Sequence, residues 1–90
     1  MKVYVIIRGL FNRQHISYDS EIKLKTDATL KKLMVEIRKR VNFDFIYLIE
    51  SKLSNPVIML NGNSLNLLED LSTILKEDDE VIILQSLGGG

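Results

Sequence analysis

Hydrophobic and polar positions change their spacing several times along the chain, and each spacing predicts a different element. Residues 2–8 form an almost continuous run of Val, Ile and Tyr, which is typical of a strand buried within a sheet. From Ile16 to Leu24, apolar residues fall on even positions, as expected for a strand with one face on a core. Residues 9–15 interrupt the apolar pattern and are predicted to form a loop. The two strands should pair as an antiparallel hairpin.

The pattern then changes to that of an amphipathic helix. Thr29 is a good N-cap because its hydroxyl can accept a hydrogen bond from a free backbone N–H in the first turn. Residues 43–53 are interpreted as a short second helix, although their aromatic side chains would also suit a strand. The main helix should turn one apolar stripe towards the core, formed by Leu30, Leu33, Met34, Ile37 and Val41.

Two later apolar segments predict the remaining strands. Residues 57–60 end at Asn61-Gly62, a pair that favours a tight turn. Residues 63–73 predict a short strand or turn, and residues 80–86 predict the last strand. Because the first and last strands are the most hydrophobic, we expect them side by side and parallel in the middle of the sheet. This order indicates an α+β protein of the β-grasp type, a mixed sheet of four to five strands with one main helix packed on one face.

Length and charge limit the protein classes that fit. We expect a single domain over residues 1–87, followed by a glycine tail at residues 88–90. Twelve basic and twelve acidic residues give no net charge, so the composition predicts no binding to nucleic acid or to an anionic membrane surface. No apolar run approaches membrane-spanning length and no secretory signal is recognisable, so the cytoplasm is the expected location.

Residue sets for catalysis or metal binding are missing from the sequence. There is no cysteine, and His15 is the one histidine, which rules out thiolate chemistry and gives no support to a Ser-His-Asp triad. Neither glycine-rich phosphate-binding motif occurs, and the acidic residues do not follow a calcium-loop pattern. We therefore expect a protein that is not itself an enzyme and that binds no metal or cofactor.

The glycine tail is the one unusual feature. Three of the five glycines are Gly88, Gly89 and Gly90. Glycine has no side chain to pack and much backbone freedom, so such a tail should be mobile and slim enough to thread a narrow channel in another protein. Its reactive group would be the α-carboxylate of Gly90, activated as an adenylate with ATP held by a partner. The alternative is a frayed terminus without function.

At this point the sequence resembles a known family, the MoaD-like and ThiS-like sulfur carriers. Residues 71–81 (L-S-T-I-L-K-E-D-D-E-V) are similar to its closing pattern L-x-T-x-L-x-x-G-D-E-V, and residues 57–62 to its apolar strand ending in Asn-Gly. The start of the helix, residues 29–33, is also similar. The family's terminal Gly-Gly then falls on residues 89–90, with Leu87 at the root of the tail. Asp78 replaces a usual glycine, and residues 85–86 replace the proline pair common in the molybdopterin-synthase type.

The resemblance implies a ubiquitin-like β-grasp protein with chemistry at its terminus. A ubiquitin-activating-like enzyme would adenylate Gly90, and sulfur transfer would give a thiocarboxylate for molybdopterin (molybdenum cofactor), thiazole or tRNA thiolation. Alternatively, Gly90 would be conjugated to lysines of target proteins. Two further alternatives are an interaction module without acyl chemistry and the non-catalytic small subunit of a synthase. Partner docking would use Leu87 and the sheet residues Tyr4, Ile6 and Ile83, whose exposure depends on strand register.

Overall fold

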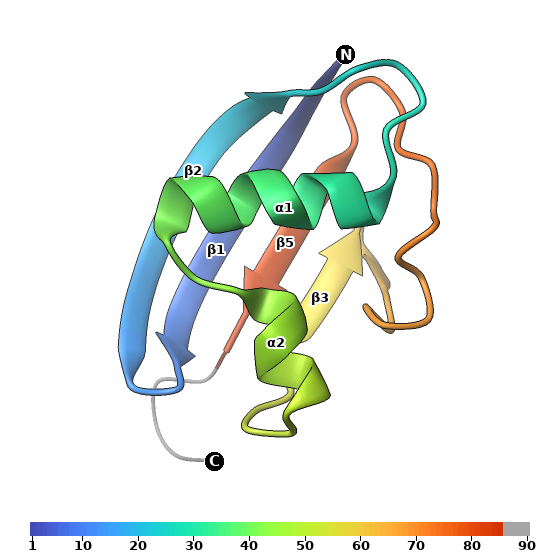
Figure 1. The fold of residues 1–90 in the computed structure, drawn as a ribbon. Helices are drawn as coiled ribbons and strands as arrows, with labels where there is room; N and C mark the ends of the chain where they lie inside the picture. The colour runs from blue at the N-terminus through green and yellow to red at the C-terminus, as the bar shows by residue number, and fades with distance from the viewer. Residues whose placement is uncertain (86–90) are drawn as a thin grey trace.

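The computed structural model describes residues 1–85, which form a five-stranded mixed sheet with two helices on one face (Figure 1). The strand order is β2-β1-β5-β3-β4. At the centre, β1 (Lys2–Phe11) runs parallel to β5 (Glu80–Leu84), as the hydrophobic runs predicted. The outer strands β2 (Gln14–Lys23), β3 (Val57–Leu60) and β4 (Asn63–Ser64) pair antiparallel with their neighbours. This arrangement is the predicted β-grasp sheet.

The β1–β2 hairpin is longer than the sequence suggested. Residues 9–15 were predicted to be a loop, and this is wrong: β1 continues to Phe11, and β2 begins at Gln14. Only Asn12 and Arg13 form the turn, both with positive φ (46° and 69°). Phe11 explains the extension, because it is fully buried and packs edge-on against the ring of Phe45 with 5.0 Å between centroids.

Both helices begin at the residues their capping chemistry requires. The Thr29 hydroxyl accepts a hydrogen bond from the Lys32 backbone N–H at 3.3 Å, so α1 (Leu30–Val41) has the predicted N-cap. A left-handed Asn42 (φ 54°) ends this helix. The short helix predicted within residues 43–53 is confirmed as α2 (Phe45–Glu50), which Asp44 caps by accepting from the Tyr47 N–H at 3.0 Å.

The core lies between the sheet and α1. Odd-numbered residues of β1 point into it, as do alternate residues of β5, and the helices lie across this face of the sheet. Burial of this continuous apolar layer is the main stabilising contribution to the fold. The largest fully buried side chains are Val3, Val5, Ile7, Phe11, Ile22, Leu30, Leu33, Ile37, Leu48, Leu75, Val81 and Ile83.

Asp79, the one buried charged residue among residues 1–85, ties the turn before β5 to the β3–β4 turn. Its carboxylate accepts from the Lys76 backbone N–H and from the Asn61 side-chain amide, each at 2.8 Å. The Asn61 side-chain oxygen Oδ1 in turn accepts from the Glu80 backbone N–H at 2.8 Å. These contacts hold the Asn61-Gly62 turn beside the start of the central strand.

Replacing Asp79 with alanine should therefore lower the free energy of unfolding by about 2 kcal/mol, because two part-buried hydrogen bonds lose their charged acceptor. Urea denaturation measures the change. Glu69→Ala is the control, since Glu69 is exposed and its side chain makes no hydrogen bond within the described part of the chain. Equal stability of the two variants would contradict the assigned role of the Asp79 carboxylate.

Asp78 keeps the backbone conformation that a glycine would adopt. Its φ is 66°, and its N–H donates to the Lys2 carbonyl at 2.8 Å, so the turn is closed despite the departure from the family pattern. A left-handed residue with a side chain carries steric strain that glycine lacks. Asp78→Gly should raise the free energy of unfolding by about 0.5–1 kcal/mol, measurable by thermal and urea unfolding. A loss of stability would show that the Asp78 side chain favours the turn.

Candidate functional site

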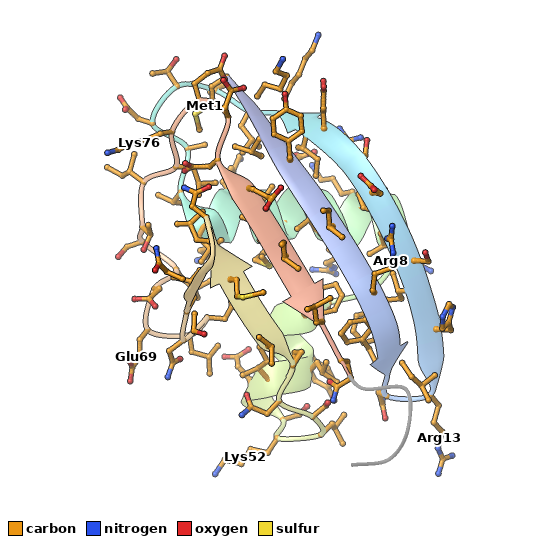
Figure 2. All side chains as sticks on the ribbon, turned by 180° about the vertical axis from the view of Figure 1, so that it is seen from behind. Met1, Arg8, Arg13, Lys52, Glu69 and Lys76 are labelled. Atoms are coloured by element: carbon orange, nitrogen blue, oxygen red, sulfur yellow. The ribbon has the colours of Figure 1, made fainter. Side chains whose placement is uncertain are left out.

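The open face of the sheet carries a continuous apolar surface. Helices cover only one face, and Figure 2 shows the other face from behind, with side chains standing out from the central strands. The register places Ile6 beside Ile82 and Ile82 opposite Met59. Leu84 lies opposite Val57, which is 51% exposed. We call this surface the apolar strip, and it consists of Ile6, Val57, Met59, Ile82 and Leu84.

Charged side chains border the apolar strip. On β2, Asp19 stands opposite Ile6, and Glu21 stands opposite Tyr4. Glu80 lies on the other side of Tyr4, at the start of β5. A protein that docks on the apolar strip is expected to have an apolar surface bordered by basic residues. Basic residues at that border would attract the acidic side chains around the strip and would orient the two proteins as they associate.

Two cations lie within this border. The Arg8 guanidinium donates to the Tyr18 carbonyl at 2.9 Å and approaches Asp19 at 3.5 Å, so it is partly neutralised. The Lys2 ammonium lies over the Tyr4 ring, 5.8 Å from its centroid. Hydrogen bonding and charge interaction with Tyr4, and then the charge of Glu21, raise the pKa of Lys2 above its ordinary value.

The chain leaves the sheet at a closely fitted point, the tail root, formed by Gly9, Ser54 and Gln85. The Gln85 N–H donates to the Arg8 carbonyl at 3.1 Å, and the Ser54 hydroxyl donates to the Gln85 side-chain oxygen. Gly9 has φ +146°, and a Cβ there would lie 2.3 Å from the Gln85 carbonyl oxygen. Only glycine allows the two backbones to come this close.

Sequence reasoning missed the role of Gly9. We had interpreted it as the start of a loop, whereas it lies inside β1 and pairs with Ile16. The available signal was an isolated glycine within an apolar strand, a pattern that often marks the close approach of another backbone.

The structure separates the predicted docking residues into two groups. Tyr4 and Ile6 lie on the open face and are partly exposed, as docking requires. Ile83 is fully buried, so its prediction as a partner contact is wrong. In the parallel pairing with β1 it stands beside the buried Ile7, and its neighbour Ile82 takes the open-face position. A shift of one residue along a strand moves a side chain to the opposite face.

The predicted reactive tail lies outside the described residues, and so does the prediction that it is mobile. This applies to Leu87, Gly88, Gly89 and Gly90 alike. Within residues 1–85, no group of three or more acidic, histidine or cysteine side chains could hold a metal ion. Helices long and apolar enough to cross a membrane are also missing from these residues.

Comparison with known proteins decides the family. The family model described as the ThiS family matches residues 10–90, which include the strip residues on β3 and β5, Ser54 and Gln85 of the tail root, and the terminal glycines. The chain belongs to the ThiS family. No curated protein sequence matches it significantly.

Solved structures confirm the ubiquitin-like β-grasp fold of this ThiS-family chain. SAMP1 from Haloferax volcanii is 13% identical with a TM-score of 0.65, each chain being covered completely. Urm1 from Trypanosoma brucei is 16% identical with a TM-score of 0.64, over 99% of this chain and 95% of its own. A complex of subunits 1 and 2 of the molybdopterin-converting factor from Helicobacter pylori contains a chain 24% identical, with complete coverage of both and a TM-score of 0.58.

Family membership and fold together support a sulfur-carrier or ubiquitin-like modifier role. In the described residues, the apolar strip is an open surface on the sheet, and the tail root is the point at which the chain leaves the sheet.

Proposed function

We propose that this protein is a sulfur carrier whose Gly90 carboxylate is converted to a thiocarboxylate. The carboxylate would attack the α-phosphorus of ATP on a ubiquitin-activating-like enzyme, releasing pyrophosphate and leaving an acyl-adenylate. Sulfide, or an equivalent sulfur nucleophile, would then displace AMP. Because a carboxylate is otherwise a poor acyl donor, activation by the partner is essential, and this chain contributes the acyl group and the docking surface.

The observation that carries the proposal is the family match, which extends to Gly90 and so includes the terminal glycines. Local geometry supports it. Gly90 is five positions after Gln85, and five residues of extended chain span at most about 18 Å. A partner that covers the apolar strip must therefore place its reactive centre within that distance of the tail root.

We expect the adenylating enzyme to bind the apolar strip with an apolar surface bordered by basic residues, since acidic side chains of β2 and β5 border the strip. A larger synthase subunit could use the same surface at a later step. The Helicobacter pylori neighbour was solved as a complex of two subunits, which supports a small-subunit role for this chain. The sulfur acceptor would be molybdopterin precursor, thiazole or tRNA.

The second candidate function is a ubiquitin-like modifier, joined through Gly90 to lysines of other proteins. Its support is the similarity of fold to SAMP1 and Urm1, the ubiquitin-like sulfur-carrier neighbours. Both candidates share the adenylation step and differ in the nucleophile that displaces AMP. A sulfur nucleophile gives a thiocarboxylate, whereas a lysine amine gives an isopeptide.

Isotope exchange between pyrophosphate and ATP tests the shared step. With the activating enzyme from the same source, the full chain should support exchange and the variant lacking Gly90 should not. Retained exchange in the truncated variant would overturn the assignment of the Gly90 carboxylate. If both chains fail while the enzyme activates its other carrier, the chain is an interaction module and the proposal is wrong.

A further inference from the structure

The zero net charge conceals a strong segregation of charge. Residues 23–40 contain seven basic and two acidic residues, whereas the rest of the chain contains five basic and ten acidic residues. The basic segment comprises Lys23 at the end of β2, the loop to α1 and most of α1; the loop and α1 lie on the helix side of the sheet. The balanced composition predicted no binding to nucleic acid or to an anionic membrane surface, and that prediction concerns the whole chain; the loop and α1 nevertheless carry a local excess of positive charge.

A cavity of about 480 Å³ lies at the centre of this basic region, between the β2–α1 loop and the first turns of α1. Its size is within the range of small-molecule sites. The nearly buried Leu24 and half-buried Ala28 contribute apolar surface, and the Thr29 hydroxyl lies at the edge. The cavity therefore combines an apolar floor with a charged rim.

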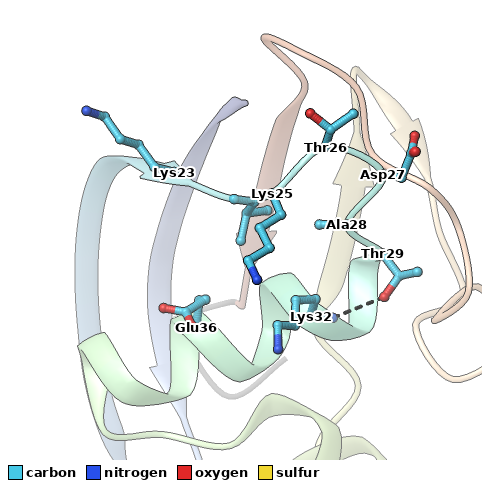
Figure 3. A pocket seen from close by; sticks show the side chains of 9 residues that line it. Lys23, Lys25, Thr26, Asp27, Ala28, Thr29, Lys32 and Glu36 are labelled. Atoms are coloured by element: carbon cyan, nitrogen blue, oxygen red, sulfur yellow. Dashed lines mark hydrogen bonds between the residues drawn. The ribbon is translucent and has the colours of Figure 1, made fainter.

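Two lysines meet at this cavity from different elements. Figure 3 shows the Lys25 side chain extending from the loop towards α1, where Lys32 lies, while Lys23 extends away. Among the described residues, neither Lys25 nor Lys32 has a carboxylate within ion-pair distance. Glu36 also lines the cavity, but its carboxylate is paired with Lys39 at 3.3 Å. The fifth charged group, Asp27, extends in another direction from the loop.

The backbone N–H groups in the first turn of α1 are already hydrogen-bonded and are not available to bind an anion. The Leu30 and Lys31 N–H groups donate to the Thr73 and Leu71 carbonyls, each at 2.9 Å. The Lys32 N–H is taken by the Thr29 hydroxyl. Any attraction for an anion must therefore come from the lysine side chains, which can be tested separately by substitution.

We propose that this cavity binds a small phosphate ester, with the phosphate between Lys25 and Lys32 and the organic part on Leu24 and Ala28. Two converging ammonium groups match the double charge of a phosphate better than a single carboxylate. The discrete cavity favours a small molecule over an extended polyanion. This inference is independent of the proposed carrier function.

The cavity lies at the end of the sheet away from the tail root. Lys23 pairs with Lys2 at the start of β1, whereas Gln85 bonds to Arg8 near the other end of that strand. It also lies on the helix side, opposite the apolar strip. A bound phosphate ester would thus leave both the docking surface and the tail root free.

The test is an NMR titration of the amide resonances with AMP and with inorganic phosphate at constant ionic strength. Saturable shifts centred on residues 23–36 are expected, with tighter binding of AMP because it can cover the apolar floor. Lys25→Ser and Lys32→Ser should each weaken binding about tenfold, through loss of a close charge. Lys31→Ser is the matched control, because Lys31 is on the same turn but does not line the cavity, and it should change binding less than about twofold.

Shifts that do not saturate would overturn the proposal, and so would equal weakening of binding by Lys31→Ser and Lys32→Ser. An oligonucleotide or acidic peptide that perturbs the whole α1 surface, with no saturable response to AMP, would also overturn it in favour of a macromolecular partner. The substituted lysines are exposed and their side chains form no hydrogen bond within residues 1–85, so the variants should retain the fold. Their unperturbed spectra outside the cavity check this directly.

Discussion

Replacing Gly9 with alanine should lower the free energy of unfolding by about 2–4 kcal/mol, a large fraction of the stability of a domain of this size. The added Cβ would lie 2.3 Å from the Gln85 carbonyl oxygen and 2.8 Å from its nitrogen, so the backbone of one strand must move. The φ of +146° adds conformational strain for any residue with a side chain. Urea denaturation measures the loss.

Gly62→Ala is the matched control for this prediction. Gly62 also has positive φ (+85°), but a Cβ there would meet no atom within 4 Å, so the substitution carries conformational strain without a clash. We expect it to cost about 1 kcal/mol. If the two variants were equally stable, the close approach of Gln85 would not be the reason that residue 9 must be glycine. The Gly9→Ala variant should also bring its Gln85 amide out of its hydrogen bond to Arg8, which amide exchange detects.

The second large effect concerns the apolar strip. Ile82→Asp should weaken binding of the adenylating enzyme by roughly 30-fold or more, because a charge would be buried at the centre of the docking surface. The variant should stay folded, since Ile82 lies on the open face. Titration calorimetry with the enzyme measures the affinity, and thermal unfolding checks the fold.

Two controls make this result specific. Leu68→Asp places the same charge on another exposed apolar residue, 39% exposed and outside the strip, and should leave binding within about twofold. Ile83→Asp should instead unfold the protein, because Ile83 is fully buried in the core. Wild-type affinity of the Ile82→Asp variant would show that the partner binds elsewhere.

The main architecture could be predicted because it depends on local patterns. Thr29 and the apolar stripe of α1 indicated a helix, and the two most hydrophobic runs indicated a central parallel pair, which is confirmed as β1 and β5. The side-chain chemistry of Asn61-Gly62 likewise predicted the β3–β4 turn. These signals require no knowledge of which segments pack together.

What the sequence could not provide depends on long-range pairing. The register of β5 with β1 decides which side chains of β5 face the core. Apolar residues at consecutive positions do not show which of them face the core. The sequence therefore predicted Ile83, and not Ile82, as a partner contact. The role of Gly9 depends on Gln85, which lies far away in sequence. The charge segregation is different, because it is visible in the sequence: residues 23–40 carry the basic excess in one continuous segment, and only the total charge conceals it.

Asp78 shows how a departure from a family pattern can leave the geometry intact. A glycine at that position indicates a left-handed turn, and Asp78 adopts the same φ region while its N–H closes the turn onto β1. At the tail root, the Gln85 side chain accepts from Ser54, a contact that a proline at this position could not make. A side-chain hydrogen bond thus holds Gln85 where the family pattern has a proline.

Intact mass spectrometry tests the central claim most directly. The purified chain is incubated with the activating enzyme, ATP and sulfide, and its mass is compared with that of the variant lacking Gly90. The account predicts exchange of one oxygen for one sulfur in the full chain, located by fragmentation at Gly90, and no exchange in the truncated variant. An unchanged mass, in a reaction where the enzyme thiocarboxylates another carrier, would contradict it.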